Sequence, residues 1–223
     1  VTIFCKGWDL HVTEALKISL EENLELVYDS IRYLKKHVPQ VTLGIEHFYD
    51  GYKANPGYTL QLIKAALDAG SEYVGTADTN GGCLPHEIAE IIGDVRNHFD
   101  AELSIHAHDD SGLALANTLQ AVESGVTVLH GTINGLGERC GMTDHCVLIP
   151  NLKLKMGIDC VTDEQMKLLR RASIVVAQIT NMPLPKYKPY VGAHAFYHKA
   201  GVHMDAMMKN PKAYDHIEPE LVG

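Results

Sequence analysis

The sequence predicts an α/β fold in which β-strands and α-helices alternate. Five short runs of apolar and β-branched residues indicate strands, and each precedes a segment with the periodicity of an amphipathic helix. From Val41 onward the strands recur at intervals of about 30 residues, the length of one βα unit. This alternation favours a parallel sheet covered by helices, either an open doubly wound sheet or a closed (β/α)8 barrel. Periodicity does not choose between the two.

The predicted elements form five βα units. Their strands are Val1–Cys5, Val41–Ile45, Glu72–Ala77, Glu102–Ile105 and Thr127–Ile133. Their helices, in which apolar residues recur three or four positions apart, are Glu21–His37, Tyr58–Ala69, Pro85–His98, Gly112–Glu123 and His145–Met156. Beyond them, Thr162 is predicted to cap a helix that reaches about Asn181, and Pro183–Pro189 indicates a linker to a small appendage.

Composition excludes several classes of protein. The chain has 223 residues, of which 46% are hydrophobic, as expected for one globular domain or a domain with an appendage. Its net charge of -9 argues against a nucleic-acid or membrane partner, because such surfaces require clustered Lys and Arg. The ligand is therefore predicted to be a small molecule.

Cysteine usage and hydropathy indicate a cytoplasmic protein. The five cysteines form no CxxC pair and leave one over, which fits reduced thiols better than a disulfide framework. No apolar run approaches the roughly 18 residues needed to cross a bilayer, and no secretory leader is visible. We predict a soluble, cytoplasmic protein.

Two histidines at the end of the fourth predicted strand are the first candidates for a functional site. Side chains alternate faces along a strand, so His106 and His108 point the same way and lie within reach of one divalent ion. They follow a buried strand at the end where parallel sheets bind ligands. A hydrogen-bonded structural pair is the alternative, because thirteen histidines place some pair at this spacing by chance. The position favours a metal or catalytic role.

Polar residues also follow the other four strands. They are Lys6, Trp8, Asp9 and His11; Glu46 and His47; Asp78, Thr79 and Asn80; and Thr132 and Asn134. Structural alternatives exist, since Glu46 would suit pairing with a helix N-terminus or an arginine, and Asp78 and Asn80 would suit a turn. Asn134 would also suit a turn, but its carbonyl oxygen suits a hard cation. The run Gly135–Gly141 lacks the spacing and ending of a P-loop, so no nucleotide cradle is indicated.

Three motifs carry a resemblance to a known family. They are His106-Ala107-His108-Asp109-Asp110, Asn134-Gly135-Leu136-Gly137-Glu138-Arg139-Cys140-Gly141 and Ala200-Gly201-Val202-His203. Together they resemble the 2-isopropylmalate, homocitrate and citramalate synthases, and the resemblance covers essentially the whole chain. Three further segments, Trp8–Val12, Glu46–Pro56 and Pro189–Gly192, look most like the citramalate synthase branch.

The resemblance implies a (β/α)8 TIM barrel followed by a helical appendage. Residues 1–157 would be the C-terminal part of the catalytic barrel, starting near its fourth strand, and residues 158–223 a post-barrel helix, linker and small subdomain. The first strand, with its catalytic arginine and metal-binding aspartate, and any regulatory domain would then lie outside the chain. Because such a fragment leaves open sheet edges, we expect it to be inactive alone.

The resemblance also implies roles for individual residues. The metal ligands would be His106, His108 and Asn134, the contacts to a 2-oxoacid Glu46 and Thr79, and the catalytic residues Glu46 and His203. Gly44 lies on the strand face of Glu46, so we expect it to shape the floor of the substrate pocket. Histidine has an ordinary pKa of about 6.5, which suits proton removal near neutral pH. Since three other histidines share the segment of His203, a surface position is its alternative.

The implied activity is a metal-dependent Claisen-type condensation of acetyl-CoA with a 2-oxoacid. Pyruvate is the expected 2-oxoacid, giving citramalate for isoleucine biosynthesis, with 2-isopropylmalate or homocitrate synthase as the alternatives. A metal-dependent lyase or aldolase, or an inactive fragment, is the alternative of another class. The ligand set suits Mg²⁺, Mn²⁺ or Zn²⁺, and the family implies a homodimer.

Overall fold

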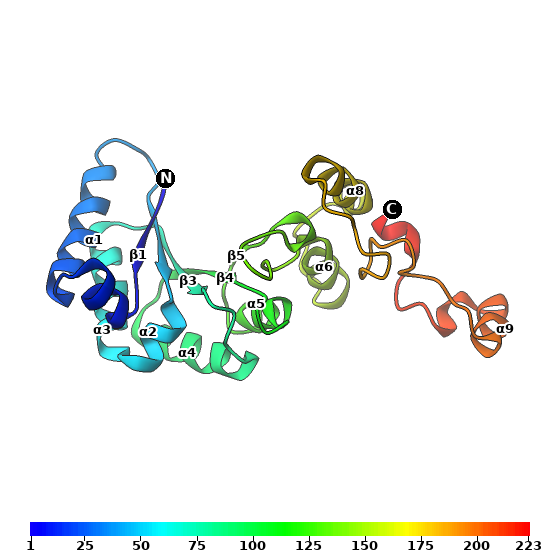
Figure 1. Cartoon of the computed structure of the whole chain (residues 1–223), viewed down its shortest axis with the longest axis horizontal. Helices are drawn as coiled ribbons and strands as arrows, with labels where there is room; N and C mark the ends of the chain where they lie inside the picture. The colour runs from blue at the N-terminus through cyan, green and yellow to red at the C-terminus, as the bar shows by residue number, and fades with distance from the viewer. The chain divides into compact units, whose positions relative to one another are not determined.

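The computed structural model describes the backbone of residues 1–223 and every side chain except that of Pro211. The chain forms two compact units: unit 1 comprises residues 1–131 and 137–143, and unit 2 comprises residues 132–136 and 144–223. Unit 1 contains a five-stranded parallel sheet in the order β1-β2-β3-β4-β5 (Figure 1). The strands are β1 Thr2–Lys6, β2 Thr42–Glu46, β3 Tyr73–Asp78, β4 Glu102–Ala107 and β5 Val128–His130.

Helices connect successive strands of unit 1. They are α1 Leu20–Leu34, α2 Phe48–Ala54, α3 Pro56–Ala69, α4 Pro85–His98 and α5 Ala114–Glu123, with a π-helical turn, η1 His11–Leu16, before α1. Apolar side chains on one face of the sheet pack against these helices in one core, which includes the fully buried Leu43, Ile45 and Ile105. Burial of this face holds the helices on the sheet and leaves its other face for the site.

Local signals determine where the helices begin and end. Ser19 and Glu22 form a reciprocal capping box at the start of α1, with hydrogen bonds of 3.1 and 2.7 Å. At α3 the side chain of Asn55 accepts a backbone hydrogen bond at 3.2 Å, and Pro56 occupies the first turn. Gly70 ends the same helix with a left-handed φ of 100°.

The strand register arranges the other face of the sheet in layers. One layer aligns Phe4, Gly44, Gly75, Ser104 and Val128. The next layer toward the carboxyl edge pairs Lys6 with Glu46, Ala77 with His106, and His106 with His130. Layers of this kind fill the interior of (β/α)8 barrels, and their carboxyl edge carries the functional groups.

Unit 2 is helical. Its elements are η2 Ile133–Gly135, α6 His145–Pro150, η3 Asn151–Lys155, α7 Asp163–Met166, α8 Leu169–Thr180, α9 Gly201–Lys209, η4 Pro211–Ala213 and η5 Pro219–Val222. A second core packs Cys146, Met166, Leu169, Val191 and Val222 together. Among the residues that the structure describes, no helix is long and apolar enough to cross a membrane.

The predicted alternation of parallel strands and helices is confirmed, and α4 spans the predicted Pro85–His98. The helix predicted for His145–Met156 divides at Pro150, because proline lacks the N–H that would continue the hydrogen-bond ladder. The helix capped by Thr162 breaks after Met166, and α2 and α9 were not predicted. The division between residues 157 and 158 stays a prediction.

Two glycines offer a matched test of packing. A Cβ on Gly51 in α2 would lie 2.4 Å from the carbonyl oxygen of Gly7, whereas a Cβ on Gly93 in α4 would meet nothing within 4 Å. Gly51→Ala should lower the free energy of unfolding by roughly 1 to 3 kcal/mol. Gly93→Ala should raise it by about 0.5 to 1 kcal/mol, because alanine favours helix. Denaturant titration of the protein that carries this chain measures both, and equal effects would contradict the packing described for α2.

Candidate functional site

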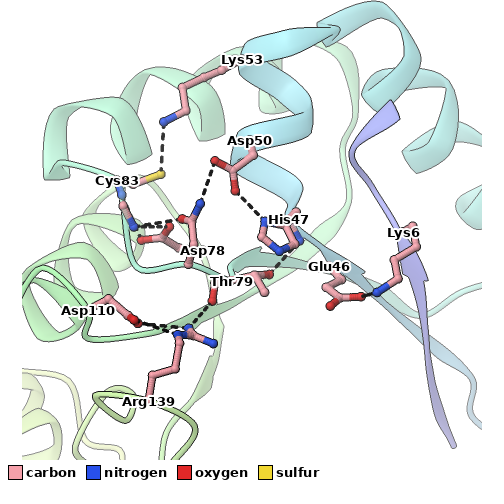
Figure 2. Close-up of polar contacts among 12 residues, drawn as sticks. Lys6, Glu46, His47, Asp50, Lys53, Asp78, Thr79, Cys83, Asp110 and Arg139 are labelled. Atoms are coloured by element: carbon pink, nitrogen blue, oxygen red, sulfur yellow. Dashed lines mark hydrogen bonds and ion pairs between the residues drawn. The ribbon is translucent and has the colours of Figure 1, made fainter. Parts of the chain in front are cut away.

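Polar side chains gather at the carboxyl edge of the sheet in unit 1, where β1 to β4 end (Figure 2). Lys6 at the end of β1 forms an ion pair with Glu46 at the end of β2, as their register pairing requires. Both side chains are partly exposed, at 26% and 29%. The predicted substrate residue Glu46 is therefore reachable from solvent, and Lys6 compensates its charge.

The turn after β2 positions the next predicted residue, Thr79. His47 adopts a left-handed φ of 53°, and its N–H donates to Thr79 Oγ1 at 2.7 Å. Nδ1 of His47 lies 2.8 Å from Oδ2 of Asp50, whose Oδ1 accepts from Asn80 at 3.2 Å (Figure 2). A hydroxyl that accepts through its oxygen keeps its own proton to donate. The Thr79 hydroxyl thus keeps a proton that it can donate, and its contact with a 2-oxoacid stays a prediction.

Asp78 has a structural role. Its carboxylate is fully buried and accepts from the backbone N–H groups of Gly82 and Cys83 at 3.1 and 3.3 Å, and from Asn117 Nδ2 at 3.2 Å. Burial raises the pKa of Asp78, while these hydrogen bonds oppose the rise. The carboxylate thus holds the turn between β3 and α4. Of the roles considered for Asp78, that of a turn residue fits these contacts.

His106 and His108 lie together as their spacing predicts. Their Nε2 atoms are 3.4 Å apart. Nδ1 of His108 lies 3.1 Å from the carbonyl oxygen of Gly141, and since a carbonyl only accepts, Nδ1 carries the proton. In neutral His108 the lone pair is therefore on Nε2, facing His106. Burial, followed by the charges of His108 and His130, lowers the pKa of His106 to about 4, which keeps that ring neutral near pH 7.

This pair fits two positions of a divalent ion. Two nitrogens bound to one ion at about 2.1 Å are roughly 3.0 to 3.4 Å apart at octahedral or tetrahedral angles. An outer carbonyl that fixes the tautomer of a ligand histidine is also typical of metal sites. Among the described side chains, no cluster of three or more His, Cys, Asp or Glu is arranged to hold a metal. A third ligand from the described part of the chain would be of another type, such as an amide.

The amide predicted for that role, Asn134, belongs to unit 2. It adopts a left-handed φ of 68° in η2, and its carboxamide is held by Ser173 of α8. Nδ2 donates to the Ser173 carbonyl at 2.9 Å, and Oδ1 accepts from Ser173 Oγ at 2.6 Å. Lys188 donates to the Asn134 carbonyl at 3.0 Å and pairs with Asp144 at 2.5 Å. Sγ of Cys146 also donates to Oδ1, at 3.8 Å. Asn134 as the third ligand stays a prediction.

The predicted catalytic histidine also lies in unit 2. His203, in the first turn of α9, stacks on Tyr214 with ring centroids 4.1 Å apart. His198 contacts both rings, at 6.1 and 5.8 Å, and its Nε2 lies 2.9 Å from Oδ1 of Asp215. His203 is therefore part of an ordered aromatic cluster and not an isolated surface side chain. Its catalytic role stays a prediction.

Sequence reasoning missed one residue of the site in unit 1. Arg139 is hydrogen-bonded to Asp110 and to the backbone of Thr79 (Figure 2). The available signal was its place in the Asn134–Gly141 motif that carries the resemblance, which assigned this side chain no role.

Two family profiles match the chain. The profile described as HMGL-like covers residues 1–176, and the one described as Homocitrate synthase post-HMGL domain-like covers residues 190–223. The chain belongs to the HMGL-like family. The predicted resemblance is confirmed, and so is the fold class: the parallel sheet is part of a (β/α)8 barrel, followed by a helical C-terminal part.

Three kinds of synthase are among the relatives of this chain. An (R)-citramalate synthase from Aquifex aeolicus is 55% identical over all of this chain and 42% of its own length. In Sulfolobus acidocaldarius, an (R)-citramalate synthase is 50% identical over 99% of this chain and 42% of its own length. A homocitrate synthase and a 2-isopropylmalate synthase of that organism are 36% and 35% identical over all of this chain, and over 47% and 57% of their own lengths. The chain thus spans less than half of the citramalate synthases it matches.

Solved structures support the fold alone. The HMG-CoA lyase of Bacillus subtilis superposes with a TM-score of 0.71 at 22% identity, over 82% of this chain and 64% of the lyase.

Replacing His106 or His108 tests whether these two histidines bind a divalent ion. His106→Ala and His108→Ala should each weaken Mn²⁺ binding by at least about 10-fold, because each removes one nitrogen facing the ion. His86→Ala, at an exposed position of α4, is the matched control and should bind as the unaltered protein does. Calorimetric titration with Mn²⁺ measures all three, and unchanged affinity in both site variants would contradict the assignment.

Proposed function

We propose that the protein carrying this chain condenses acetyl-CoA with pyruvate to give (R)-citramalate. The supporting observation is the difference in identity within one organism: 50% to the citramalate synthase of Sulfolobus acidocaldarius against 36% and 35% to its homocitrate and 2-isopropylmalate synthases. Membership of one common family would not make the citramalate synthase more similar to this chain than the other two synthases are. A closer relation to the citramalate synthases accounts for the difference.

The proposed reaction has three steps. His203 removes a proton from the acetyl methyl group, and the resulting enolate attacks the ketone carbon of pyruvate, whose C=O bond becomes an alkoxide that takes up a proton. Water then hydrolyses the thioester, releasing CoA and citramalate. Bound by His106, His108 and Asn134, a divalent Mg²⁺, Mn²⁺ or Zn²⁺ would supply Lewis acidity toward the ketone. Which of these ions is native does not follow from the ligand set.

Glu46 and Thr79 have complementary tasks in this proposal. The Thr79 hydroxyl, oriented by the N–H of His47, donates a hydrogen bond to the 2-oxoacid. Lys6 neutralises the negative charge of Glu46, so that Glu46 does not repel the carboxylate of the 2-oxoacid. Gly44 and its register partner Gly75 carry no side chain. In this proposal, backbone atoms therefore form the floor of the substrate pocket at these two residues.

The appendage favours a synthase over a lyase. Residues 190–223 match a domain that is named for homocitrate synthase, and they hold the His203–Tyr214 stack. Beyond the reaction itself, we propose a cytoplasmic homodimer that acts in isoleucine biosynthesis, with no nucleic-acid or membrane partner.

Substrate choice tests the proposed function. The protein that carries this chain is incubated with acetyl-CoA, Mn²⁺ and one of three acceptors: pyruvate, 2-oxoisovalerate or 2-oxoglutarate. Free thiol release and product mass should favour pyruvate by at least about 10-fold, since one methylene is worth roughly that much. Preference for either larger acceptor would assign the protein to another branch, and thiol release without a condensation product would contradict a synthase.

His203→Ala separates proton transfer from metal binding. Turnover should fall by roughly 100-fold or more, the usual contribution of a general base, while Mn²⁺ affinity stays unchanged. His194→Ala, an exposed histidine of the same segment, is the control. Unchanged turnover in His203→Ala would remove this residue from the mechanism.

A further inference from the structure

One guanidinium joins three loops at the carboxyl edge of unit 1. Nε of Arg139 donates to Oδ1 of Asp110 at 2.7 Å, and Nη2 donates to Oδ2 of the same carboxylate at 3.0 Å. Nη2 also donates to the carbonyl oxygen of Thr79 at 2.6 Å. Figure 2 shows the guanidinium between these two partners, which follow β4 and β3. The third loop is the one that carries Arg139 itself.

The loop of Arg139 determines the orientation of His108. The Gly141 carbonyl, two residues beyond Arg139, accepts from Nδ1 of His108 at 3.1 Å and from the N–H of Asp109 at 3.0 Å. Met142 forms an isolated antiparallel bridge with His108. If the loop moved, the Gly141 carbonyl would move with it, and the tautomer and direction of the His108 ring would no longer be fixed.

Arg139 also contacts Thr79, at the backbone carbonyl and not at the hydroxyl to which the proposed function assigns the 2-oxoacid. The Thr79 carbonyl accepts from Arg139, and its Oγ1 accepts from the N–H of His47 at 2.7 Å. These two hydrogen bonds constrain the backbone and the side chain of Thr79 separately. Removing the first would release the Thr79 backbone while leaving the second intact.

The backbone of Arg139 points to the same role. A non-glycine residue with a φ of 55° adopts a conformation that costs free energy, so the surrounding contacts have to hold it. The Arg139 and Asp110 side chains are 43% and 25% exposed, and ion pairs that exposed contribute little to stability. Three hydrogen bonds from one planar guanidinium do fix the orientation of its two partners. The ammonium group of a lysine could not make the same set.

We propose that Arg139 is a positioning residue that fixes, relative to each other, the metal-facing nitrogen of His108 and the backbone that carries the Thr79 hydroxyl. The part concerning Thr79 rests on the proposed function, because it assumes that this hydroxyl binds a 2-oxoacid. The part concerning His108 requires only that the His106–His108 pair binds a metal. The two parts therefore have separate readouts.

Arg139→Ala in the protein that carries this chain tests both parts. Mn²⁺ affinity, measured by calorimetry, should fall by about 10- to 100-fold, the usual effect of losing an outer-shell contact, and the KM for pyruvate should rise. The midpoint of thermal unfolding should stay within a few degrees. Free guanidinium at millimolar concentration should restore much of the Mn²⁺ affinity, because the site of the lost group is exposed. Arg32→Ala, an exposed arginine of α1, is the control for a lost surface charge.

A conservative variant and a tautomer measurement keep the proposal testable if Arg139→Ala does not fold. Arg139→Lys retains the positive charge but cannot form the two parallel hydrogen bonds to Asp110. It should therefore lose most of the Mn²⁺ affinity that Arg139→Ala loses. In metal-free protein labelled with ¹⁵N-histidine, the His108 signals should change from one tautomer to a mixture in either variant, with His108→Gln used to assign them.

The outcomes separate this proposal from the proposed function. Wild-type Mn²⁺ affinity and a single His108 tautomer in a folded Arg139 variant would overturn the positioning role, whatever the activity. A loss that guanidinium does not reverse and that parallels a lower unfolding midpoint would show a purely structural role. If the unaltered protein does not condense acetyl-CoA with pyruvate but Arg139→Ala still weakens Mn²⁺ binding, the proposed function fails and the His108 part stands.

Discussion

The candidate site depends on the hydrogen bond between Nδ1 of His108 and the carbonyl oxygen of Gly141. This bond decides which nitrogen of His108 carries its proton, and so whether a lone pair faces His106 across 3.4 Å. Without it, the proton of neutral His108 could lie on Nε2, where it would prevent that nitrogen from binding a cation. A carbonyl on Nδ1 instead leaves the facing nitrogen as an acceptor, and that state suits a cation.

The parallel sheet makes this arrangement possible. Register pairing brings the carboxyl ends of β1 to β4 to one edge, so that residues 29 to 60 positions apart contact each other. The helices on the other face supply the buried apolar area that holds the sheet in shape. Polar groups at the edge are then ordered by one another: Lys6 with Glu46, and His47 with Thr79.

Periodic features of this chain could be predicted from sequence. The alternation of strand and helix, the limits of α4 and the common direction of His106 and His108 all follow from side-chain spacing along one element. The α2 helix could not, because its seven residues, with Gly51 in the middle, are too short to display a helical period. The break after Met166 also has no periodic signal, since apolar residues continue on both sides.

Contacts between distant segments were less predictable. Arg139 reaches a backbone carbonyl 60 residues earlier, and Asn134 is held by Ser173, 39 residues later. Backbone carbonyls are present at every residue, so sequence does not indicate which of them a side chain will find. The resemblance to the synthases identified the motif of Arg139 but assigned that side chain no task, and the positioning role proposed for it rests on contacts that only the fold shows.

Anomalous scattering tests the metal site most directly, in crystals of the protein that carries this chain, grown with Mn²⁺ and soaked with pyruvate. We expect one strong Mn²⁺ peak in contact with Nε2 of both His106 and His108, while Nδ1 of His108 remains bonded to Gly141. A peak elsewhere, or a His108 ring that binds through Nδ1, would contradict it.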